Sequence, residues 1–211
     1  MYEFLTWFVS KVHAAKPFMP IIEEGLAHTS THKIINIDQE IGAGIETIIP
    51  YLPKTIEVKK IPLQQFNSKE KGLYTCINSF HLLKPNVAKK LISDIANSNQ
   101  PVTVLEGNNN SLWQLFGMLI FVPLSVILSA PFVKPFRIER LVFTYLIPIL
   151  PIVTSIDGII ALFKLYAPKD LNKLVSEIKV PNYTWRSGKL DNGRGGKIIY
   201  LIGFPNESQL I

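Results

Sequence analysis

The sequence has few charges and almost no cysteine. Only 18% of its 211 residues are charged, and a single cysteine, Cys76, cannot form an internal disulfide bond. A disulfide scaffold and a cysteine-rich zinc site are therefore excluded, and a reducing compartment is expected. The first residues include an acid, Glu3, and no basic segment followed by a small-residue cleavage site. We therefore expect no signal peptide.

Hydrophobic residues, in contrast, are abundant. They make up 47% of the chain and give a mean hydropathy of +0.23, values that exclude a disordered chain. The net charge of +6 is modest and scattered, so no nucleic-acid partner is expected, whereas a weak attraction to anionic lipid surfaces is compatible with it. The length predicts a single domain over residues 1–211, with a helical N-terminal region over 1–30.

The hydrophobic excess lies in two runs. Residues 107–133 and 141–156 contain no charged residue, and a short charged stretch, residues 134–140, separates them. Each run is near or above the roughly 18 to 20 apolar residues that cross a bilayer as a helix. Two crossing helices would carry the basic stretch to the far side, against the positive-inside tendency. We predict instead a membrane-associating helical insertion over 111–166 that stays on the cytoplasmic side; two buried core helices are the alternative.

Outside these runs, strand and helix patterns alternate. Short apolar segments predict strands at 33–38, 72–77 and 101–105, and helical patterns occupy 45–51 and 86–97. At the end of the chain, a glycine-rich turn over residues 191–196 joins two strand-like segments and predicts an antiparallel hairpin. This order predicts an α/β sheet with helices on both faces.

Two turns that follow predicted strands carry the candidate site. Gly42 and Gly44 lie between a strand and a predicted helix, an arrangement that lets the backbone approach a nucleotide-like ligand; a tight turn without a ligand is the alternative. Asn78, Ser79 and His81 follow the next strand and are expected in the same crevice. No nucleophile elbow surrounds Ser79, so hydrolase chemistry is not expected, and no spacing of metal ligands predicts a metal site.

Six segments occur together in this chain. They are residues 34–52, 78–81 (Asn-Ser-Phe-His), 104–107, 131–137, 143–148 and 157–158. Together they resemble a bacterial group of class I S-adenosylmethionine-dependent methyltransferase-like proteins, over most of the chain from about Phe4 to Pro205. The resemblance implies a Rossmann-like sheet, S-adenosylmethionine across the end of the first strand, and the apolar insertion after the strand that ends at Glu106.

The resemblance also assigns cofactor-binding positions on the first strand and its loop. In an ungapped alignment Asn36 replaces the family's acid and Glu40 replaces its leading glycine, while Gly42 is kept. Asp38, between Asn36 and Glu40, is a further cofactor-binding position. A shifted frame matches residues 40–44, ending at Gly44, to the glycine-rich loop. In both frames the loop has lost glycines, and a glutamate there would crowd the methionine moiety of the cofactor.

Further positions follow from the same resemblance. Glu57 resembles the acid of a following strand, Asn78 and Ser79 would line the cofactor crevice, and His81 is the candidate base. The neighbouring second histidine of the family is Leu82 here.

The chain is also short for a complete sheet of this type. Gly44 and Cys76 are only 32 positions apart, which leaves room for one β–α unit fewer than the family has. We therefore predict a membrane-associated methyltransferase-like protein that acts on a small or lipid-like acceptor. The alternative is a catalytically inactive homologue that serves as a membrane-bound scaffold or partner protein.

Overall fold

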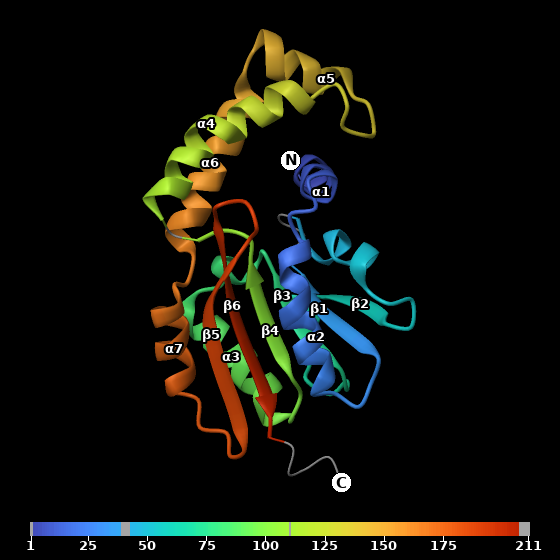
Figure 1. The fold of residues 1–211 in the computed structure, drawn as a ribbon, viewed down its shortest axis with the longest axis vertical. Coiled ribbons are helices and arrows are strands. Elements are labelled where there is room, and N and C mark those ends of the chain that lie inside the picture. Colours follow the sequence, from blue (N-terminus) through green and yellow to red (C-terminus); the bar gives the residue numbers. More distant parts are fainter. Residues whose placement is uncertain (1, 39–42, 110, 207–211) are drawn as a thin grey trace.

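A computed structural model describes residues 2–38, 43–109 and 111–206 (Figure 1). Within them, six strands form one mixed sheet in the order β2-β1-β3-β4-β6-β5. The strands are β1 (Lys33–Asp38), β2 (Glu57–Pro62), β3 (Leu73–Ile77), β4 (Val102–Glu106), β5 (Tyr183–Asp191) and β6 (Lys197–Pro205). Strands β1 to β4 are parallel, and β6 is antiparallel to both of its neighbours, β4 and β5. The predicted α/β class and the C-terminal antiparallel hairpin are confirmed.

The helices fall into two groups, those that pack on the sheet or its edges and those of an insertion between β4 and β5. The first group comprises α1 (Tyr2–Lys11), α2 (Met19–Ala27), α3 (Pro85–Asn97), α7 (Pro168–Ser176) and the 3-10 helices η1 (Lys16–Phe18), η2 (Ile45–Thr47), η3 (Ile49–Tyr51), η4 (Leu63–Gln65) and η5 (Phe80–Leu82). The insertion comprises α4 (Leu112–Ser129), α5 (Ile138–Leu141), the π-helical turn η6 (Val142–Leu146) and α6 (Ile149–Lys164).

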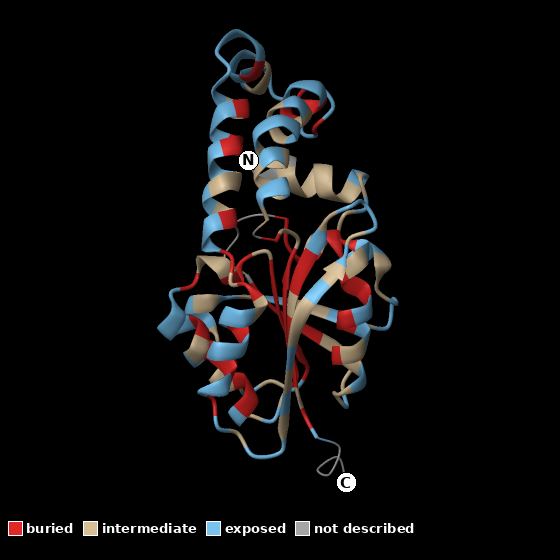
Figure 2. Cartoon of the chain, turned by 60° about the vertical axis from the view of Figure 1, so that its left-hand side comes forward, coloured by how far each residue is buried: buried red, intermediate tan, exposed pale blue. Residues whose placement is uncertain are grey.

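The sheet is the middle of three layers, and its central strands β1, β3, β4 and β6 are largely buried, whereas the edge strands β2 and β5 are not (Figure 2). Side chains alternate along each strand, so that Ile35 and Ile37 pack under α3 and α7 while Ile34 packs under α2. Helix α2 lies close to the sheet because it carries Gly25, where a Cβ atom would stand 2.7 Å from the Leu73 side chain. Helices therefore cover both faces, as predicted.

The connections between the first strands differ from the prediction. The helix expected over 45–51 is replaced by the two 3-10 helices η2 and η3, and the chain then enters β2, a strand that the sequence pattern did not reveal. Pro50 and Pro53 fall in this stretch, and a proline lacks the N–H that a continuous helix needs. Only η4 lies between β2 and β3, so no α-helix connects β1, β2 and β3 among the described residues.

The insertion is a helical hairpin that projects from the end of the sheet where β4 ends (Figure 1). Helices α4 and α6 pack side by side, and Gly158 permits their close approach, since a Cβ there would lie 2.9 Å from Met118 Sδ. Ser111 caps α4 by accepting a hydrogen bond from the Gln114 N–H at 3.3 Å. The chain returns through η6, and its axis bends by 82° before α6.

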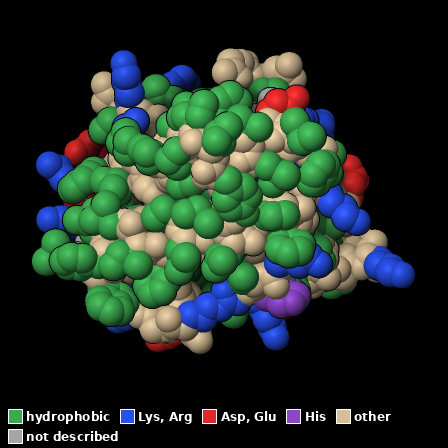
Figure 3. All heavy atoms as spheres, turned by 90° about the horizontal axis from the view of Figure 1, so that it is seen from above, with side chains coloured by type: hydrophobic (Ala, Val, Ile, Leu, Met, Phe, Trp, Pro, Cys, Tyr) green, Lys and Arg blue, Asp and Glu red, His purple; other side chains and the backbone are tan. Residues whose placement is uncertain are grey.

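The surface of this hairpin is mostly apolar. Of the 25 large hydrophobic side chains exposed among the described residues, 23 lie between 112 and 163. Seen from the hairpin end, hydrophobic side chains cover much of the molecule, and lysines and arginines lie around the rim (Figure 3). By length and composition α4 is long and apolar enough to cross a membrane. Most side chains of α4 and many of α6 are exposed, which contradicts the alternative in which both helices are buried in a core.

Candidate functional site

The order of the strands reverses between β1 and β3. The chain leaves β1 towards β2 on one side and leaves β3 towards β4 on the other. In open α/β sheets such a reversal opens a crevice at the carboxyl ends of the two strands, and ligands bind there. The carboxyl ends of β1, β3 and β4 lie at the end of the sheet that carries the hairpin (Figure 1). A ligand in this crevice would therefore lie near the base of the hairpin.

Asn78 ties together the loops around the crevice. Its Nδ2 donates a hydrogen bond to the carbonyl oxygen of Ala43 at 2.6 Å, and its Oδ1 accepts one from the Gly107 N–H at 2.7 Å. The residue has a left-handed backbone with a φ of 52°, which asparagine tolerates better than most residues. One side chain thus connects the loops that follow β1, β3 and β4.

His81 and Glu106 form a second arrangement at the same edge. The Glu106 carboxylate accepts the His81 backbone N–H at 3.0 Å and contacts His81 Nδ1 at 3.0 Å, and both side chains are nearly buried, at 11% and 6% exposure. A carboxylate only accepts hydrogen bonds, so Nδ1 carries the proton of this pair. The pairing leaves Nε2 of His81 as the nitrogen available to take a proton.

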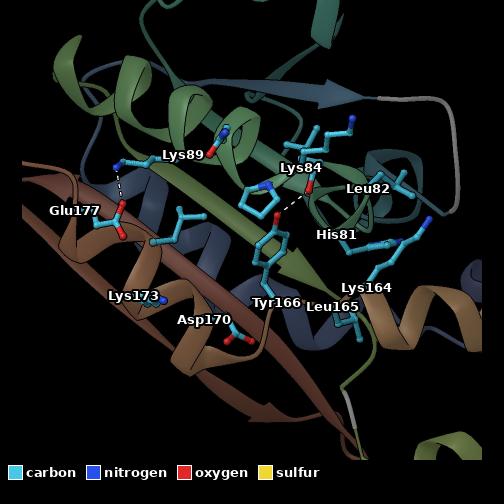
Figure 4. Close-up of a pocket in the computed structure, with 14 residues that line it drawn as sticks. His81, Leu82, Lys84, Lys89, Lys164, Leu165, Tyr166, Asp170, Lys173 and Glu177 are labelled. Atoms are coloured by element: carbon cyan, nitrogen blue, oxygen red, sulfur yellow. Dashed lines mark hydrogen bonds and ion pairs between the residues drawn. The ribbon is translucent and has the colours of Figure 1, made fainter.

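His81 also lines a pocket of about 810 Å³ between α3 and α7 (Figure 4). The other lining residues come from η5, the first turns of α3, the end of α6 and α7: Leu82, Leu83, Lys84, Pro85, Asn86, Lys89, Lys164, Leu165, Tyr166, Asp170, Lys173, Leu174 and Glu177. The pocket thus opens beside the candidate base and beside the last turn of the hairpin.

Tyr166 fixes the base of the hairpin against this pocket. Its hydroxyl donates to the carbonyl oxygen of Leu83 at 2.7 Å, and its ring lies 5.4 Å from that of Phe80. Partial burial raises the pKa of the Tyr166 hydroxyl, which therefore stays a hydrogen-bond donor at neutral pH. The hairpin is consequently anchored next to η5, the short helix that contains His81.

The structure brings together only some of the predicted site residues. Asn78, Ser79 and His81 lie at the carboxyl end of β3, and Gly44 is buried next to Ala43, which Asn78 contacts. Glu40 and Gly42 lie outside the described residues, and Asp38 is the last residue of β1.

Two further predicted cofactor-binding residues, Asn36 and Glu57, lie within strands of the sheet. Asn36 is 1% exposed and its Oδ1 accepts a hydrogen bond from the Thr75 hydroxyl at 2.9 Å, so it bridges two strands inside the sheet. Glu57 is the first residue of β2, paired with Lys33 at 3.1 Å. Glu57 therefore lies at the amino end of β2, opposite the crevice. The sequence around it did not reveal where β2 begins.

The described residues fit S-adenosylmethionine poorly. The β1 loop leads into the three-residue η2 and not into a longer helix whose N-terminal N–H groups would face a ligand. The Ala43 carbonyl and the Gly107 N–H are already paired with Asn78. No carboxylate on the described part of β2 reaches the crevice, since Glu57 is at the far end and β2 ends at Pro62.

Sequence patterns missed the lining of the pocket. Lys84 is far in the chain from Lys164 and Tyr166 and none of them belongs to a motif, so only the packing of α6 against η5 and of α7 against α3 brings them together. Comparison with known protein families and with curated proteins finds no match to this chain. The assignment of function consequently depends on the geometry described above and on the resemblance of the segments.

Proposed function

We propose that this chain is a membrane-associated, class I methyltransferase-like protein that acts at the cytoplasmic face of a membrane on a small or lipid-like acceptor. The observation that carries the proposal is the position of the hairpin. It follows β4 directly, so its exposed apolar surface and the His81–Glu106 pair lie at the same edge of the sheet. An acceptor that is dissolved in lipid would meet this edge without leaving the bilayer surface.

The apolar surface supports the membrane part of this proposal. Transfer of a half-exposed large apolar side chain from water to hydrocarbon is favourable by about 1 kcal/mol. On the hairpin, 23 exposed large apolar side chains are present. Even after generous allowance for the partial exposure, their transfer is worth on the order of 10 kcal/mol. In a pair of core helices, these side chains would instead be buried against the rest of the protein.

The mixed sheet supports the methyltransferase-like part. Its parallel strands, its strand-order reversal and its C-terminal hairpin agree with the resemblance of residues 34–52 and 78–81, apart from one missing β–α unit. In this proposal His81 takes a proton from the hydroxyl or amine of the acceptor, and Glu106 is a positioning residue that holds the His81 ring.

A second candidate, the catalytically inactive homologue, is favoured by one observation. Asn78 bridges the loops on either side of the crevice, because it pairs with both at 2.6 and 2.7 Å and so occupies their backbone groups. In this case the sheet and the hairpin form a membrane-bound scaffold or partner protein, without methyl transfer.

Two measurements test the proposals separately. The methyltransferase-like proposal requires that isothermal titration with S-adenosylmethionine gives a binding heat for the full chain in detergent. No heat and no thermal shift at saturating cofactor would favour the inactive homologue. A Glu40→Gly variant that gains cofactor binding absent from the parent would support the same conclusion.

Vesicle flotation tests the membrane part. The wild type is expected to float with phosphatidylcholine vesicles, and Ile120→Glu, in the exposed face of α4, is expected to weaken binding about tenfold or more. Ile49→Glu is the matched control, because Ile49 is a similarly exposed isoleucine outside the hairpin. Equal flotation of the two variants would contradict attachment through the hairpin.

A further inference from the structure

The pocket beside His81 has an excess of positive charge. Four lysines and two acids line it: Lys84, Lys89, Lys164, Lys173, Asp170 and Glu177. Both acids are engaged within the protein, since Glu177 pairs with Lys89 at 2.6 Å and Asp170 accepts the Ala167 N–H at 3.0 Å. Lys89 in turn holds the pKa of Glu177 below its ordinary value, so this carboxylate stays negative. Lys84 and Lys164 have no ion-pair partner within the part of the chain that the structure describes.

The first turn of α3 adds to the positive potential. Lys84 is its N-cap residue, no side chain caps the helix, and no acid lies in the first turn of its 13 residues. Lys84, Pro85 and Asn86 all line the pocket, so the positive end of the helix dipole faces it. An anion in the pocket would thus meet unpaired ammonium groups and the positive end of this helix dipole together.

The position of the pocket relative to the bilayer follows from the side chains on α6. Asp157 is exposed on this helix and a carboxylate is costly inside hydrocarbon, while Ile160 and Phe163 beyond it are exposed apolar side chains, so in the attached protein this part of α6 would lie in the interfacial region. Lys164 is two helical turns further, about 10 Å along the axis. In the attached protein Lys164 would therefore lie at the level of the lipid headgroups or slightly further from the bilayer centre. Phosphate is the principal anion there.

We propose that the pocket between α3 and α7 binds the phosphate of an anionic membrane lipid, with Lys84 and Lys164 as its main contacts. This inference rests on the proposed attachment to the membrane and adds the class of molecule that the attached protein recognises. Because His81 lines the same pocket, the bound lipid headgroup lies next to the candidate base. The acceptor of the proposed reaction is then a phospholipid or a phosphorylated lipid of similar shape.

A double variant, Lys84→Ala with Lys164→Ala, tests the proposal. Flotation is measured with vesicles of phosphatidylcholine alone and of phosphatidylcholine with phosphatidic acid. The wild type is expected to prefer the anionic vesicles, and the double variant to lose about tenfold or more of that preference. Lys169→Ala with Lys179→Ala is the matched control, because both lysines are exposed, do not line the pocket, and remove the same charge. Circular dichroism confirms that each variant is folded.

The outcomes separate this proposal from the attachment itself. Wild type that binds neither kind of vesicle overturns both proposals. Wild type that binds neutral vesicles but has no preference, or a double variant that behaves like its control, overturns lipid headgroup recognition and leaves attachment intact. Thermal stabilisation of the wild type in detergent by inorganic phosphate, without a preference for anionic vesicles, would assign the pocket to free phosphate and overturn the lipid assignment.

Discussion

At the scale of residues, polar side chains hold together parts of the sheet that the backbone ladder does not reach. Glu70, in the turn before β3, forms ion pairs with Lys33 of β1, at 3.1 Å, and with Lys59 of β2. Its backbone carbonyl also accepts the Tyr74 hydroxyl at 2.9 Å. These contacts secure β2, which is an edge strand of the sheet among the described residues.

The Glu70 cluster makes stability depend on pH. Lys59 and Lys33 lower the pKa of Glu70 below its ordinary value of 4.5. A lowered folded-state pKa contributes stability that is present above 4.5 and is lost as pH falls through the folded value. Because the group is a third exposed, we expect about 1 kcal/mol or less. Urea unfolding below pH 5 should show a smaller pH dependence for Glu70→Gln than for wild type. Glu23→Gln, an exposed control, should resemble wild type.

The His81–Glu106 pair predicts a coupled effect on stability. Glu106→Ala leaves the two His81 donors without their acceptor in a nearly buried site, and should cost about 1–3 kcal/mol of unfolding free energy. His81→Ala should cost less, because the remaining carboxylate keeps a backbone donor. A double-mutant cycle by urea denaturation in detergent should give a coupling above about 0.5 kcal/mol. Additive effects would show that the pair is not a unit.

At the scale of elements, close packing of α2 depends on a glycine. A Cβ at Gly25 would lie 2.7 Å from Leu73 Cδ1 and 3.1 Å from Thr103 Cγ2. Leu73 is fully buried, so its side chain has no room to move away.

Substitution of this glycine tests the packing of α2. Gly25→Ala gains helix propensity of about 1 kcal/mol, but overpacking against Leu73 should make the net change destabilising by about 1–2 kcal/mol. In a Leu73→Ala background the clash with Leu73 disappears and only the milder contact with Thr103 at 3.1 Å remains, so Gly25→Ala should there be neutral or stabilising. Thermal unfolding of the four proteins measures this reversal, and a destabilisation that is equal in both backgrounds would contradict it.

At the scale of the whole molecule, the sheet and the hairpin are largely independent. Both core clusters are built almost wholly from residues outside the insertion, and Leu162 at the end of α6 is the main exception. Met118 and Gly158 face each other across α4 and α6. The hairpin beyond these two positions can therefore be removed without opening the cores.

Excision of the hairpin tip is expected to yield a water-soluble protein. Replacing residues 119–157 by a short Gly/Ser linker removes most of the exposed apolar side chains and keeps Leu115 and Leu162, which pack on the core. The shortened chain should be monodisperse without detergent and keep the circular dichroism spectrum of the α/β part. Aggregation, or loss of cooperative unfolding, would show that the hairpin is part of the fold and not an addition to it.

The sequence by itself determined the elements with strong local patterns. Residues 33–38, 72–77 and 183–204 carry apolar runs or a glycine turn, and the uncharged runs after Glu106 predict an apolar insertion, because hydrophobic periodicity and charge are local properties. Strand β2 was missed since its residues mix lysines and apolar side chains at an exposed edge.

Only the tertiary structure decided which side chains meet. The pairing of His81 with Glu106, the clamp of Asn78 between two loops, and the pocket that joins Lys84 to Lys164 all link residues far apart in the chain. The same is true of Asn36, which meets Thr75 across β1 and β3, and of Glu57, which meets Lys33 across β2 and β1. Contacts of this kind depend on how strands and helices pack in three dimensions, and no pattern of neighbouring residues encodes them.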